Sequence, residues 1–140
     1  LLRIRSRNRD AGGVMMGVIQ RASIILPTVA PLGTETLSIA DAIEHVSLSL
    51  PTENLQEKVV YVYATNVAGA AAPLSVWVEV APSDVVAGYV LLGTATILPL
   101  TADAVIQWTT HSRFVRFVAQ VPAYVVGTWV CQVVYEAKGP

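Results

Sequence analysis

The sequence predicts an all-β protein: an antiparallel β-sandwich or jelly roll with an extended N-terminal arm and at most one short helix. Short runs of β-branched and aromatic residues recur along the 140-residue chain, as is typical of strands. Eight prolines and nine glycines separate these runs, at spacings of roughly 8–15 residues that suit an antiparallel sandwich. Helical periodicity is scarce by comparison.

The strongest strand prediction is Thr128–Lys138, where Trp129, Cys131, Val133 and Tyr135 alternate with outward positions. A period of two with these residue types indicates a strand that buries one face. The other predicted strands, in chain order, are Ile24–Leu26, Val46–Leu50, Val59–Thr65, Leu74–Val80, Tyr89–Leu92, Thr96–Leu98, Val105–Thr109 and Phe114–Val121.

Two connections carry turn signals of their own. The segment Asn66–Pro73 is rich in glycine and alanine, so we expect the strands on either side of it to form a hairpin with a long loop. Val121-Pro122-Ala123 is the expected bend before the last strand, with Gly127 as a candidate bulge. The best helix candidate is Ser38–His45, where Ser38 is a potential N-cap.

The charges divide the chain into two unequal parts. Arg3, Arg5, Arg7 and Arg9 alternate at the start without an intervening acid, so the first nine residues carry +4. The rest holds five basic residues against all 10 acids, a net −5. Gly12-Gly13 is the one obvious flexible joint. We therefore expect an extended basic arm at residues 1–13 and a single β-sandwich domain at 14–140.

The composition indicates a protein with partners. Charged residues make up 14% of the chain and the mean hydropathy is +0.56, which leaves too much apolar surface for a small isolated domain. Val85–Ala102 is uncharged, but its glycines, threonines and proline indicate strands separated by a turn and not a membrane span. Val14–Ile19 is too short for a secretory signal.

Three residue groups are candidates for a catalytic or metal site. Cys131 lies among apolar strand residues and is expected to be a buried hydrophobe and not a nucleophile. Asp41, Glu44 and His45 would share one helix face, yet no second cluster completes a metal site.

The third group, His111-Ser112-Arg113, lacks the acid and the oxyanion hole that hydrolase chemistry requires. Arg113 and Arg116 point to opposite faces of a strand, and we expect one of them to reach an acid. We predict no catalytic residue, no bound metal, no cofactor and no enzymatic activity. The tryptophans and tyrosines could form a sugar platform on a sandwich face, although aromatic residues in strands are more often core.

The arm has the sharpest functional prediction. In an extended chain Arg3, Arg5, Arg7 and Arg9 all project one way. They are suited to a subunit-contact role, in which the arm pairs with the sheet edge of another subunit and its arginines lie over acids. Nucleic acid phosphates are the lesser option, because four arginines without aromatic interleaving make a small footprint and the body is acidic.

The arm at Leu1–Asp10, the Gly12-Gly13 joint and the strand-rich remainder resemble virion structural proteins of the β-sandwich or jelly-roll type. Capsid, cement (decoration) and tail subunits of this type carry arms that lace neighbours together. The resemblance implies a structural subunit in a virion or extracellular assembly, with copies of itself and a further structural subunit as partners. Two alternatives stay open: a filament or pilus-like subunit assembled by strand complementation, and a glycan- or small-ligand-binding module.

Overall fold

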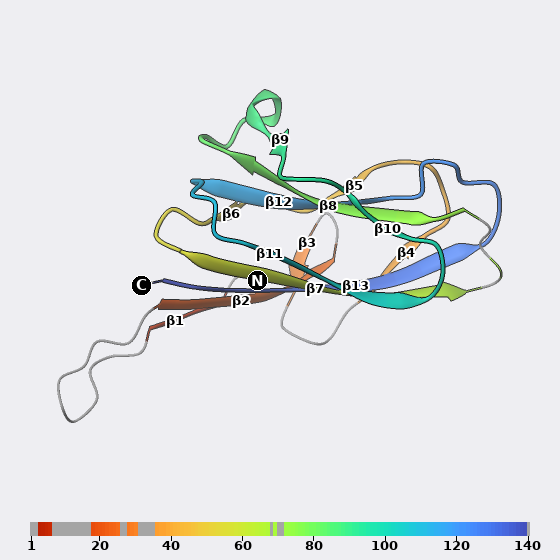
Figure 1. Ribbon diagram of the computed structural model, residues 1–140, viewed down its shortest axis with the longest axis horizontal. Coiled ribbons are helices and arrows are strands. Elements are labelled where there is room, and N and C mark those ends of the chain that lie inside the picture. The colour runs from red at the N-terminus through yellow and green to blue at the C-terminus, as the bar shows by residue number, and fades with distance from the viewer. Residues whose placement is uncertain are drawn as a thin grey trace.

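The computed structural model describes residues 3–6, 18–25, 28–30, 36–67, 69 and 72–139, the first three ranges by their backbone. They form two antiparallel sheets packed face to face, so the predicted β-sandwich is confirmed (Figure 1). Sheet A has seven strands: β1 (Arg3–Ser6), β2 (Val18–Ile25), β3 (Thr28–Ala30), β4 (Leu37–Ile39), β7 (Glu57–Val67), β11 (Ala102–Trp108) and β13 (Thr128–Lys138). Sheet B has six: β5 (His45–Val46), β6 (Leu50–Pro51), β8 (Leu74–Ala81), β9 (Val90–Leu91), β10 (Thr96–Leu98) and β12 (Phe114–Gln120).

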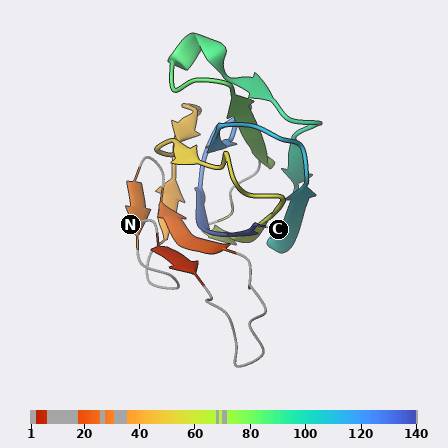
Figure 2. The same cartoon turned by 90° about the vertical axis from the view of Figure 1, so that its left-hand side faces the viewer.

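The strand order places β1 at one edge of sheet A. Sheet A runs β1-β2-β13-β7-β11, with β3 beside β2 and β4 beside β13. Sheet B runs β10-β8-β12-β5, with β9 beside β8 and β6 beside β12. In Figure 2 the red and orange strands β1 and β2 lie on one side of the sandwich and the teal β11 lies on the other.

The core lies between the sheets and follows from the period of two. In β13 the predicted inward residues Trp129, Cys131, Val133 and Tyr135 are all buried, while their neighbours stay half-buried. β8 and β12 close the core from the other side with residues such as Val78. Because successive residues of a strand point to opposite faces, one alternating sequence supplies both a core face and an outward face.

The helix predicted at Ser38–His45 is wrong. The chain instead forms β4, a bend at residues 41–43 and then β5. The Asp41 carboxylate accepts the backbone N–H of Ile43 at 3.1 Å and bonds His45 Nε2 at 2.9 Å. Side-chain bonds of this kind compete with the helical hydrogen bonds, and Ile39 is fully buried on β4. The one helical turn in the described residues is η1 (Val86–Gly88).

The predicted hairpin across Asn66–Pro73 is also wrong. β7 pairs with β11 and β13 in sheet A, whereas β8 pairs with β10, β12 and β9 in sheet B. The connection therefore crosses between the sheets, and the Trp129 indole N–H anchors it by donating to the Ala72 carbonyl at 2.9 Å. The bend before β13 crosses in the same way and includes Gly127, whose φ of 90° favours glycine.

The strand predicted at Val46–Leu50 is split into β5 and β6, which both pair with β12. Ser47 interrupts it, because its backbone N–H donates to the Phe117 carbonyl while its hydroxyl accepts the Phe117 N–H. Leu48 consequently lies exposed beyond the sheet.

Candidate interaction surfaces

The predicted contact arm is divided between described and undescribed residues. Arg3 and Arg5 lie in β1, at an edge of sheet A, whereas Arg7 and Arg9 lie outside the described residues. β1 pairs antiparallel with β2 of the same chain, and the register sets Arg3 opposite Arg21 and Arg5 opposite Ile19. The role of the four arginines in subunit contact stays a prediction.

The opposite edge of sheet A is β11. Within the part of the chain that the structure describes, β11 pairs with β7 and with no other strand. Asp103, Val105 and Gln107 point outward, and 55% of Val105 is exposed, whereas Ile106 and Trp108 face the core. An edge strand presents unpaired backbone N–H and C=O groups to its surroundings, so β11 offers a second open edge.

Part of the outward face of sheet A is apolar. Tyr63 and Val67 on β7 are 44% and 42% exposed, and Val105 on β11 lies on the same face, opposite Tyr61. Val130 and Val134 of β13 lie half-buried on the same face. An antiparallel sheet with one solvated face normally carries polar residues there, and strands apolar on both faces are typical of sheets covered on both sides.

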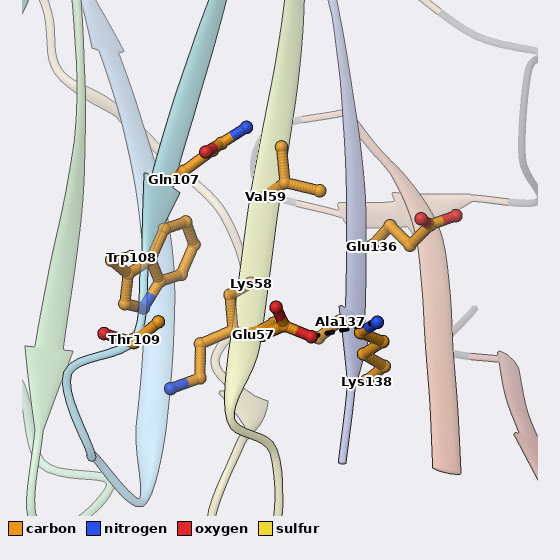
Figure 3. Close-up of a pocket in the computed structure, with 9 residues that line it drawn as sticks. All are labelled: Glu57, Lys58, Val59, Gln107, Trp108, Thr109, Glu136, Ala137 and Lys138. Atoms are coloured by element: carbon orange, nitrogen blue, oxygen red, sulfur yellow. Dashed lines mark ion pairs between the residues drawn. The ribbon is translucent and has the colours of Figure 1, made fainter. Parts of the chain in front are cut away.

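This face is hollowed at one end by an open pocket of about 510 Å³. Val59 lies between Gln107 and Glu136, its neighbours on β11 and β13, and an ion pair of 3.0 Å joins Glu57 to Lys138 at the rim. Figure 3 shows Glu57 and Glu136 pointing to the opposite side of the strands from the Trp108 ring. The pocket thus carries both charge signs around an apolar floor.

Lys58 is a buried cation that the sequence reasoning missed. It is 2% exposed, and its ammonium donates to the Thr110 carbonyl at 2.8 Å, which ties the start of β7 to the loop after β11. Burial lowers the pKa of Lys58 below its ordinary value. A lysine near the start of a strand is usually exposed to solvent, so the sequence alone does not predict that Lys58 is buried. Only the strand register, which sets Lys58 opposite Trp108, indicates its burial.

The outward face of sheet B carries a connected polar network. Arg116 Nε donates to Glu79 Oε1 at 2.6 Å, and the Trp77 indole N–H donates to Glu79 Oε2 at 2.9 Å. The Arg116 guanidinium also lies 4.0 Å from the centre of the Tyr89 ring, a cation–π distance. Arg113, just before β12, reaches Glu53 at 3.6 Å, so both arginines have acidic neighbours, where one was expected.

The network extends into the segment that covers sheet B. The Ser49 hydroxyl donates to Asp84 at 2.6 Å and accepts a hydrogen bond from the Tyr89 hydroxyl, whose oxygen lies 3.2 Å from the same carboxylate oxygen. Burial, with a smaller contribution from Asp84, raises the pKa of Tyr89. In Figure 1 the η1–β9 excursion that contains Tyr89 lies over the outer side of sheet B. The network therefore ties this excursion to the outward face of sheet B.

Cys131 behaves as the sequence indicated. It is 1% exposed on the inner face of β13, and burial raises its pKa to about 12. A thiol in such surroundings is a poor nucleophile. Trp108 and Trp129 are likewise buried, and Trp108 packs with Phe117 and Tyr135 in one aromatic cluster. Of the three tryptophans, Trp77 alone is half-buried, and its indole N–H donates to Glu79.

The remaining candidate groups do not come together as reactive sites. Asp41 pairs with His45, whose hydrogen bond lowers the pKa of the carboxyl, while Glu44 is exposed. The described residues contain no group of three His, Cys, Asp or Glu side chains positioned to hold a metal ion. Ser112 is buried, and Thr52 donates to its carbonyl at 2.9 Å.

No protein-family model matches the sequence, and no curated protein matches it either. Solved structures share its fold. PirA has a TM-score of 0.51 at 12% identity, covering 74% of this chain and 98% of that chain. A disulfide-linked pilus of Bacillus endospore appendages has a TM-score of 0.51 at 12% identity, covering 97% and 100%. A cleaved adhesin domain of Lys-gingipain from Porphyromonas gingivalis has 0.50 at 9%, covering 100% and 99%.

At these identities the similarity establishes the β-sandwich fold alone. The fold agrees with the predicted resemblance to β-sandwich structural proteins. The described residues form no helix long and apolar enough to cross a membrane.

Proposed function

We propose that this chain is a non-enzymatic structural subunit that assembles with copies of itself through its β-sandwich and its N-terminal arm. The arginines Arg3, Arg5, Arg7 and Arg9 are the contact residues of the arm, and the assembly is part of a virion or of an extracellular filament. The observation that carries the proposal is the open construction of sheet A: an arginine-bearing strand forms one edge, and an apolar strand forms the other.

Two further observations support an assembly role. The outward face of sheet A exposes Tyr63, Val67 and Val105, which a partner would cover. The fold is one that a pilus subunit also uses. The described candidate catalytic and metal groups have structural roles instead. Cys131 is buried, Asp41 pairs with His45, and the Ser112 carbonyl accepts a hydrogen bond from Thr52.

The test is removal of the arm. We expect deletion of residues 1–11 to abolish assembly, measured by sedimentation velocity and by electron microscopy, while circular dichroism retains the β-sheet spectrum. A matched variant with Arg3, Arg5, Arg7 and Arg9 changed to glutamine keeps the arm and removes its charge. Assembly of both variants at the unmodified concentration would contradict the proposal. The images also distinguish a shell from a filament.

A further inference from the structure

The pairing of the arm within its own chain is electrostatically poor. Its register sets Arg3 directly opposite Arg21 and Ile4 opposite Gln20. Like charges directly opposite each other destabilise an antiparallel pair, and an apolar residue opposite a polar one gains little. β1 is also only four residues long. An edge without basic residues would be a better partner for this strand.

β11 provides such an edge. The chain from residue 80 to residue 110 contains two acids, Asp84 and Asp103, and neither lysine nor arginine. Asp103 is exposed on β11 itself and points to the outward face. The arm carries +4 over its first nine residues. The two open edges of sheet A are therefore opposite in charge, and complementary charge favours and orients association.

The same segment is apolar as well as acidic. Of the twelve large hydrophobic residues that the described chain exposes, six lie between residues 80 and 110: Val85, Val90, Leu91, Ile97, Leu100 and Val105. Ile97 lies on β10, where sheet B ends on that side, and Leu100 lies in the link from β10 to β11. A strand docked on the open edge of β11 would cover exposed apolar surface of this kind.

We propose that the β11 edge of one copy accepts strand β1 of a second copy, so that sheet A continues from one subunit into the next. The inference rests on the proposed function and names the acceptor for the arm. In this arrangement the row of Arg3 and Arg5 shares the outward face with Asp103, and Ile4 continues the inward row of Ala104 and Ile106. The contact joins two different edges, and such head-to-tail contacts build rings or open filaments.

The test is disulfide trapping between two single-cysteine proteins in a Cys131→Ala background. One protein carries Arg5→Cys on β1, and the other carries Val105→Cys on β11, so that both cysteines lie on the outward face of sheet A. Because each chain has one cysteine, a mixed disulfide can form only between subunits. We expect the mixed dimer to be at least tenfold more abundant than with Thr65→Cys, an exposed position on β7 of the same sheet that lies off the edge.

Equal trapping at Thr65→Cys and Val105→Cys would overturn the proposal. If the Cys131→Ala background does not fold, the native cysteine is retained, since it is buried, and mass spectrometry maps the linked peptides. When deletion of residues 1–11 abolishes assembly but no link to β11 forms, the acceptor is wrong and the proposed function stands. When deletion leaves assembly intact, the proposed function itself fails.

A charge exchange provides a second readout. We expect Asp103→Arg to weaken assembly at least tenfold, while Glu53→Arg, an exposed acid paired with Arg113 elsewhere, changes it less than twofold. Arg3→Asp and Arg5→Asp combined with Asp103→Arg should recover assembly. Equal effects of Asp103→Arg and Glu53→Arg, or no recovery in the exchanged protein, would contradict the contact.

Discussion

The two sheets differ in how they treat their outward faces. The centre of the outward face of sheet B carries a polar network of its own chain: Arg116, Glu79 and Tyr89 form continuous contacts that hold the η1–β9 excursion against it. Sheet A exposes Tyr63 and Val105 and ends on two open edges. The same core serves both sheets, so the difference does not arise from folding requirements inside the sandwich.

The difference bears on the proposed assembly, because it distinguishes the surfaces that would gain from a partner. A polar residue whose hydrogen bonds are already satisfied gains little from a new contact, whereas exposed apolar area gains from being covered. The centre of the outward face of sheet B is therefore satisfied within the chain, although Val90, Leu91 and Ile97 stay exposed on β9 and β10, toward the β11 side. In the proposed assembly the partner binds sheet A at β11, beside these residues. The predictions below set the two sheets against each other.

The largest expected effect separates the two faces of β13. A pKa raised from 9.0 to about 12 leaves Cys131 with about a thousandfold less thiolate at pH 8 than an ordinary thiol. We expect native Cys131 to react with a soluble thiol reagent only after unfolding. Gln132→Cys in a Cys131→Ala background lies on the outward face, and should react at least a hundredfold faster in the unassembled protein. Rapid native labelling of Cys131 would show that the inner face is open.

The second effect tests the network on sheet B. The side chains of Arg116 and Glu79 are 17% and 15% exposed, and removing one partner of a largely buried pair leaves the other charge uncompensated. We expect Arg116→Met to lower the free energy of unfolding by about 3 kcal/mol in urea denaturation.

Arg113→Met is the matched control for Arg116→Met. Its ion pair with Glu53 is 55% and 57% exposed, so we expect a change of less than about 1 kcal/mol. At temperatures where Arg116→Met is folded, its assembly should equal that of the unmodified protein. A loss of assembly without loss of fold would place sheet B in the interface.

The third effect concerns sheet A, where we expect a substitution to weaken assembly and to leave the stability of the monomer nearly unchanged. Tyr63 is 44% exposed on a strand whose inner face is buried, so we expect Tyr63→Ser to change the free energy of unfolding of the monomer by less than about 1 kcal/mol. The same change removes apolar area from the proposed contact side and should weaken assembly in sedimentation equilibrium. A destabilised monomer with unchanged assembly would reverse the assignment of the two sheets.

The smallest effect concerns pH. Burial lowers the pKa of Lys58 in the folded state, so between that value and 10.5 the unfolded chain binds more protons than the folded one. The contribution of Lys58 therefore makes stability rise with pH through that window, and below it the contribution is constant. We expect Lys58→Met to reduce this rise in urea titrations at alkaline pH, and an identical slope in both proteins would contradict the assignment.

Much of the fold was predictable because it depends on alternation within single strands. β13 was predicted with its bounds, and Trp129 and Tyr135 were correctly assigned to the core. The hairpin across Asn66–Pro73 failed because pairing partners are chosen by the sandwich and not by neighbouring sequence. The helix predicted at Ser38–His45 does not form, because the Asp41 carboxylate accepts the backbone N–H of Ile43 and stabilises a bend there.

The candidate surfaces were predictable only in part. The alternating arginines are visible in the sequence, and the structure adds the register that opposes Arg3 to Arg21. The open edge at β11 and the network around Arg116 depend on residues distant in sequence, such as Glu79. No local pattern predicts which strand ends a sheet, because edge position is a property of the whole topology.

Hydrogen–deuterium exchange of the backbone amides, compared between the assembled and the unassembled protein, tests the central claim most directly. The account predicts that amides of β11 that lack a partner within the chain exchange at least tenfold more slowly after assembly, while those of β8 and β12 are unchanged. Protection confined to sheet B, with β11 exchanging equally fast in both states, would contradict it.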